Sequence, residues 1–151
     1  MVPHAGQPFF MQGQNTPQTQ YVNTMAKHRI LWIAASAGWL IICTVLLCMP
    51  GSAFPESSWL DNIPLFDKWV HIGMFAIMTF LICKVSMALG HTTKNTLLLI
   101  ALLCFVYGVL MEFVQHYWIP YRSFDAWDMV ADGAGAALGL LAMRIVIRRR
   151  H

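Results

Sequence analysis

Charged residues are scarce in this sequence. Asp, Glu, Lys and Arg account for 11% of its 151 residues, whereas hydrophobic residues account for 58%. In an ordinary soluble domain, roughly one quarter of the residues are charged. The composition therefore excludes such a domain and is typical of an integral membrane protein. A chain of this length with several membrane-spanning helices leaves no room for a separate soluble domain.

The sequence also lacks the short motifs of several catalytic classes. It contains no HExxH zinc motif, no nucleophile elbow and no CxxC pair. We therefore predict no metal and no cofactor, and we assign no catalytic residue. Four cysteines lie inside predicted spans, where buried and unreactive thiols are the usual state. They are Cys43, Cys48, Cys83 and Cys104.

Four apolar runs are long enough, at roughly 20 residues each, to cross a bilayer as helices. They cover residues 30–49, 69–89, 96–118 and 125–147. We therefore predict an all-α integral membrane bundle of four transmembrane helices, with residues 27–151 as its membrane domain. Residues 1–26 are rich in Gln, Asn, Thr and Pro without a helical period, which predicts a flexible tail. Because the stretch MAKHRI at Met25 resembles a natural start, the alternative is a mis-start or non-native extension.

The basic residues predict the orientation of the bundle. With the N-terminus inside, eight of the ten Lys and Arg residues fall on the cytoplasmic side, so we expect both termini to be cytoplasmic. The eight are Lys27, Arg29, Lys84, Lys94, Arg144, Arg148, Arg149 and Arg150, and the other two are Lys68 and Arg122. Lys84 lies inside a span, and its ammonium is expected to reach the surface.

All seven carboxylates fall at or near the predicted outer face, although carboxylates have little influence on insertion. They are Glu56, Asp61, Asp67, Glu112, Asp125, Asp128 and Asp132. Helical spacings of three and four put most of them on shared faces with other polar residues. These faces carry Asp67, Lys68 and His71, then Glu112 and Gln115, then Asp125, Asp128 and Asp132.

Such groups must face one another or water, because a lone charge at the bilayer centre costs on the order of 3 kcal/mol. Arg122, in the short loop before the fourth span, is their expected counter-ion. Asp125 or Ser123 is the expected helix cap. Further along the fourth span, Gly135 and Gly139 predict a close-packing face. The aromatic residues at this level are expected to be interfacial anchors; they are Trp59, Trp69, Tyr117, Trp118, Tyr121 and Trp127.

Three stretches, taken together, resemble the VanZ-like family of small bacterial membrane proteins, which is related to the teicoplanin resistance protein VanZ. They are DKWVHIGMF at 67–75, EFVQ at 112–115 and YRSFDAWDMVADGAGAALG at 121–139. The matching residues are Asp67, Lys68, His71, Glu112, Gln115, Arg122, Asp128 and Gly135. Asp132 departs from the pattern, which usually has Asn there. The resemblance covers roughly residues 30–147.

This resemblance implies a multi-pass protein of the bacterial cell membrane, linked to glycopeptide resistance or to the handling of envelope lipids. We expect an outward-facing polar pocket in which Arg122 and Lys68 contact an anionic lipid-linked or glycopeptide-related ligand. Glu112, His71 and Asp128 would shape that pocket. Membrane lipids are expected partners and nucleic acid is not. Two alternatives stay open. One is a membrane enzyme acting on a lipid phosphate, in which His71 with Glu112 or Asp128 would serve as base and acid or hold a divalent ion. The other is a structural or regulatory partner of another membrane protein.

Overall fold

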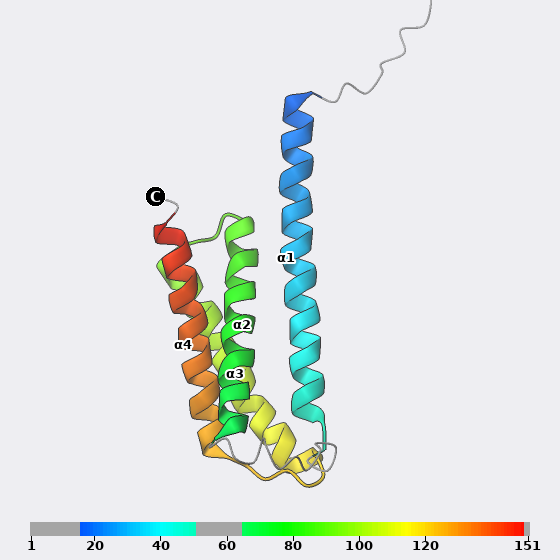
Figure 1. Ribbon diagram of the computed structural model, residues 1–151, viewed down its shortest axis with the longest axis vertical. Helices are drawn as coiled ribbons and strands as arrows, with labels where there is room; N and C mark the ends of the chain where they lie inside the picture. Colours follow the sequence, from blue (N-terminus) through cyan, green and yellow to red (C-terminus); the bar gives the residue numbers. More distant parts are fainter. Residues whose placement is uncertain (1–15, 51–64, 150–151) are drawn as a thin grey trace, which may run out of the picture.

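The computed structural model describes residues 16–50 and 65–149, and its regular structure there is entirely helical. Its helices are α1 (Pro17–Cys48), α2 (Phe66–Ala88), α3 (Lys94–Trp118) and α4 (Ala126–Arg148). Each is long and apolar enough to cross a membrane, which confirms the predicted all-α fold with four spans. The helices run alternately up and down, so α1 begins and α4 ends at the same end of the bundle (Figure 1). The cytoplasmic location of that end stays a prediction.

Helix α1 begins earlier than the sequence predicts. Residues 17–26 were expected to belong to a flexible tail, but they form the first turns of α1. The local cause is a strong start signal: Thr16 caps the helix by accepting a hydrogen bond from the backbone N–H of Thr19, and Pro17 follows at the first helical position. The rest of the predicted tail, residues 1–15, lies outside the described residues.

Helices α2 and α4 form the most extensive contact in the bundle, while α1 packs on α2 and α3. Two glycines of α4 explain how close α2 and α4 come. A Cβ atom on Gly135 would lie 2.5 Å from the backbone oxygen of Ile72, and one on Gly139 would collide with the backbone oxygen of Ala76. At these two positions only glycine lets the backbones touch.

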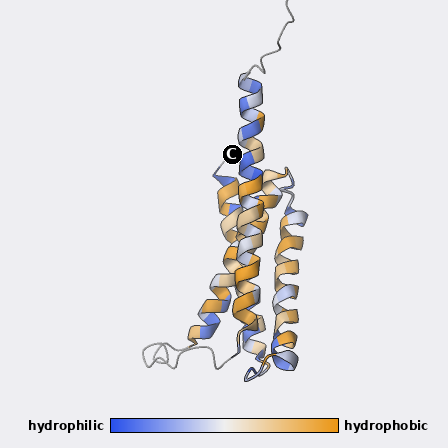
Figure 2. Cartoon of the chain, turned by 90° about the vertical axis from the view of Figure 1, so that its right-hand side faces the viewer, coloured by the Kyte–Doolittle hydropathy of each residue, from blue (hydrophilic) through white to orange (hydrophobic). Residues whose placement is uncertain are grey.

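The buried core joins all four helices. Its main cluster contains Cys43, Leu47, Met74, Phe75, Met78, Cys104, Met111 and Ala136. Many other large apolar side chains point outward from all four helices, and Figure 2 shows hydrophobic residues through the middle of the bundle and hydrophilic ones at the N-terminal end of α1. An apolar exterior of this kind suits a lipid environment.

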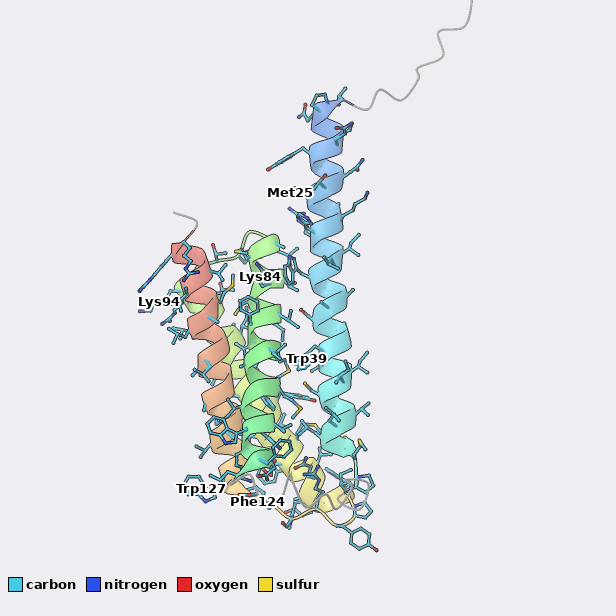
Figure 3. All side chains as sticks on the ribbon, viewed as in Figure 1. Met25, Trp39, Lys84, Lys94, Phe124 and Trp127 are labelled. Carbon is cyan, nitrogen blue, oxygen red and sulfur yellow. The ribbon has the colours of Figure 1, made fainter. Side chains whose placement is uncertain are left out.

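Polar bonds attach α1 to its neighbours. The indole nitrogen of Trp39 donates to the backbone oxygen of Met74 at 3.0 Å; Figure 3 shows Trp39 between α1 and α2. Lys84 of α2 also contacts α1, and its position differs from the predicted one. Its side chain does not reach the surface: the residue is buried, and its ammonium lies 4.6 Å from the ring centre of Trp32 in α1. This cation–π contact with Trp stabilises the ammonium between α1 and α2.

Candidate functional site

The start of α2, the end of α3 and the start of α4 meet at the end of the bundle opposite to the start of α1 and the end of α4 (Figure 1). Trp127 and Phe124 mark this end in Figure 3, and Lys94 marks the other. Most of the polar residues singled out in the sequence come together here, in two adjoining groups. The first is centred on Lys68, and the second is formed by His71, Glu112 and Asp132.

Lys68 lies at the centre of the first group and forms an ion pair with each of its three carboxylates. Its ammonium lies 2.9 Å from Asp67, 2.5 Å from Asp125 and 2.6 Å from Asp128. An ammonium has three N–H donors, so these carboxylates use all of them. The sequence predicts Arg122 in this role, whereas the structure has Lys68 there. Arg122 is half-buried in the loop between α3 and α4.

Asp125 has a second task, as the cap of α4. Its Oδ1 accepts a hydrogen bond of 2.8 Å from the backbone N–H of Trp127, while its Oδ2 accepts from Lys68. Of the two caps considered in the sequence, the structure therefore selects Asp125. The hydrogen bond from Lys68 holds the pKa of Asp125 below its ordinary value.

The second group is almost completely buried. His71, Glu112 and Asp132 are exposed by 4%, 1% and 1%, and they come from α2, α3 and α4 respectively. His71 Nδ1 lies 2.8 Å from Asp132 Oδ1, and His71 Nε2 lies 4.0 Å from Asp128 Oδ1. Glu112 Oε2 accepts a hydrogen bond of 3.3 Å from the backbone N–H of Asp125. One side-chain ligand atom from each of the three residues lies within 4.8 Å of the others.

Gly108 makes room for this group, and sequence reasoning missed it. A Cβ atom at this position would collide with the carboxylate of Asp132 and lie 2.9 Å from its Cγ. Gly108 is in α3, one helical turn before Glu112, so the same stretch of α3 supplies both the acid and the space for its neighbour. A glycine inside an otherwise apolar span, four residues before a buried acid, was the available signal.

Gln115 lies outside both groups. Its amide nitrogen donates to the backbone oxygen of Leu47 at 2.9 Å, so it attaches α3 to the last turn of α1. Five of the predicted aromatic anchors surround this end of the bundle and are well exposed; they are Trp69, Tyr117, Trp118, Tyr121 and Trp127. Trp59, Glu56 and Asp61 lie outside the described residues.

The site as a whole is acidic. Five carboxylates, those of Asp67, Glu112, Asp125, Asp128 and Asp132, are combined with one ammonium and one imidazole. Burial of several charges is costly unless each is matched by an opposite charge or a hydrogen bond. An acidic surplus at the edge of a membrane protein therefore favours binding of protons, a cation or a group rich in hydrogen-bond donors.

The sequence pattern of the VanZ/LLP1 family matches residues 8–147. This chain belongs to the VanZ/LLP1 family. The match confirms the family that the three stretches predict, and it extends further toward the N-terminus than the resemblance drawn from them. The four candidate spans and the family together identify a VanZ-like protein of multi-pass membrane architecture.

A relative is found in the fission yeast Schizosaccharomyces pombe, the uncharacterised protein C11E3.10. It is 34% identical to this VanZ/LLP1 chain over 90 residues, which are 58% of this chain and 52% of the yeast protein. The chain thus spans about half the length of the relative that it matches. Because this relative is fungal, the similarity does not by itself identify a bacterial envelope. No solved structure matches the chain.

Proposed function

We propose that this VanZ/LLP1 protein binds the headgroup of a membrane lipid or lipid-linked ligand at the membrane surface. The observation that carries the proposal is the convergence of α2, α3 and α4 on one buried group of carboxylates and an imidazole. Polar residues inside a membrane bundle are expensive and are usually kept for function.

The depth of the site supports a ligand drawn from the membrane. Exposed tryptophans and tyrosines surround this end of the bundle, and such residues favour the level of the lipid headgroups. The basic residues of the described chain gather mainly at the opposite end, which favours the outer face for the site. A headgroup would meet it there without leaving the bilayer.

The charge of the site defines the kind of headgroup. Lys68 has no N–H donor left for an anion, since Asp67, Asp125 and Asp128 take all three. A ligand with hydroxyl or amine donors suits the surplus of carboxylates, and an anionic ligand would need Arg122 or a bound cation. The wider role that fits such a site is the handling of envelope lipids, or resistance to a glycopeptide such as teicoplanin.

Lipid retention tests this proposal. The purified full chain would be transferred into nanodiscs of phosphatidylethanolamine and phosphatidylglycerol, and bound lipid counted by native mass spectrometry. Glu112→Gln and Asp128→Asn, which each remove a buried carboxylate of the site, should lower retention of the preferred lipid at least 10-fold. The control Thr79→Val changes a buried residue of α2 about two helical turns from His71, and it should behave as wild type. Wild-type retention by both site variants would contradict the proposal.

One contact favours an enzyme as the second candidate. The bond between His71 and Asp132 is the arrangement that orients an imidazole as a general base, with Asp132 on Nδ1 and Nε2 left for a substrate. The reaction would be hydrolysis or transfer at a lipid phosphate. Turnover of a lipid pyrophosphate by the purified protein, abolished in His71→Ala, would favour catalysis. Binding without turnover would favour the first candidate.

A further inference from the structure

We propose that His71, Glu112 and Asp132 bind a divalent transition-metal ion. The metal site stands on the geometry of these residues alone, whereas its part in ligand binding rests on the function proposed above. The three side chains come from three different helices and are each more than nine-tenths buried. Imidazole nitrogen and carboxylate oxygen are both protein ligands for zinc, and carboxylates also suit manganese.

The distances require only a small adjustment. The ligand atoms lie within 4.8 Å of one another. Ligands at about 2.1 Å from a zinc ion in tetrahedral geometry are separated by roughly 3.4 Å. The longest separation therefore has to shorten by at most about 1.4 Å, which side-chain rotation can supply. Three protein ligands leave a coordination position for water or for an oxygen of a bound molecule.

The neighbouring group around Lys68 also contains clustered acids, and a cation of the chain itself forms ion pairs with them. Asp67, Asp125 and Asp128 also bring three ligand atoms together, and the ammonium of Lys68 lies among them. In the described part of the chain, no Lys or Arg forms an ion pair with Glu112 or Asp132. The first group thus contains its own cation, and the second has only the imidazole of His71.

Glu112 gives independent support. It is 1% exposed, yet only its Oε2 accepts a hydrogen bond, a long one of 3.3 Å from Asp125. Among the residues that the structure describes, none donates to Oε1. A buried carboxylate with a single long hydrogen bond is only weakly compensated for its loss of water, and a metal ion beside His71 and Asp132 would stabilise its charge.

A bound metal ion would also change the charge of the headgroup that fits the site. The ion would offset two negative charges and offer a position to an oxygen of a phosphate. An anionic headgroup would then fit a site that is otherwise acidic. Asp132 supplies one of the two carboxylates, so an amide in its place should weaken binding of the ion.

Metal titration of the purified full chain in detergent tests the inference. After treatment with EDTA and its removal, Mn²⁺ would be added and free Mn²⁺ followed by electron paramagnetic resonance, with Zn²⁺ counted by mass spectrometry after desalting. We expect one ion per chain. Glu112→Gln and Asp132→Asn should each weaken binding at least about 10-fold, while Thr79→Val should bind as wild type.

Two results would overturn the metal site. One is a wild-type chain that retains no stoichiometric Mn²⁺ or Zn²⁺, and the other is unchanged binding by both acid variants. If Glu112→Gln loses helical structure by circular dichroism, Asp132→Asn decides, because it preserves the size of the side chain. Retention of phosphatidylglycerol, measured with and without Mn²⁺, separates the two proposals. Metal binding without lipid retention would support the metal site and contradict the proposed lipid ligand.

Discussion

Asp132 Oδ1 lies 2.8 Å from His71 Nδ1, across the tight contact between α4 and α2. Both residues are buried, so their bond is made inside the bundle and depends on the register in which Gly135 and Gly139 hold the two helices. A polar bond of this kind links the chemistry of the site to the packing of the fold.

The first prediction concerns the shape and polarity of residue 132. Asp132→Asn keeps a group that can bond to His71, so we expect a small change in the free energy of unfolding. Asp132→Leu leaves the imidazole nitrogen buried without its partner and should destabilise the protein by about 1–3 kcal/mol. Unfolding in mixed micelles with increasing dodecyl sulfate would measure both. Equal stability of the two variants would mean that the bond contributes nothing.

The second prediction concerns the space at Gly108. Gly108→Ala places a methyl group against the carboxylate of Asp132, and overpacking of this kind typically costs about 1–3 kcal/mol. Gly38→Ala is the matched control in α1, because a Cβ atom there meets nothing within 4 Å. The control should be neutral or slightly stabilising, since alanine favours a helix by up to about 1 kcal/mol over glycine. The same micelle unfolding assay compares the two, and a neutral Gly108→Ala would show that the acid can move away.

Much of the fold followed from the sequence because a bilayer dictates helix length. The predicted spans end close to the observed helices, and the largest difference is at α1, where capping by Thr16 and Pro17 outweighed a polar composition. The arrangement of the site was harder to predict. Helical spacing placed the acids and His71 on converging faces, but it could not tell that Lys68 rather than Arg122 lies among three carboxylates, because that depends on how far α2 and α4 are rotated toward each other.

Gln115 illustrates the same difficulty. Its spacing from Glu112 suggested a shared polar face, yet its amide bonds to Leu47 of α1. The third prediction follows: Gln115→Leu should leave the backbone oxygen of Leu47 without this donor and loosen the end of α1. Hydrogen exchange should rise in the last two turns of α1 and stay unchanged around Lys84 at the other end of α2. Unchanged exchange near Leu47 would contradict the structural role.

The fourth prediction concerns acid stability. The bond from Lys68 lowers the pKa of Asp125 in the folded protein, so the folded state binds this proton less readily than the unfolded state. The resulting stabilisation is complete above the ordinary aspartate pKa of about 4 and is lost as the pH falls through the lower folded-state value. Because the side chain of Asp125 is 37% exposed, solvent screening keeps the effect modest.

Lys68→Gln should therefore reduce the loss of stability that the wild-type protein shows as the pH falls below about 5. The difference should lie within about 2 pH units of the ordinary aspartate pKa. Lys94→Gln, which removes a lysine at the opposite end of the bundle, should keep the wild-type pH profile. The measurement is the unfolding midpoint in micelles at each pH. An identical profile for Lys68→Gln and wild type would show that Lys68 does not set the protonation of Asp125.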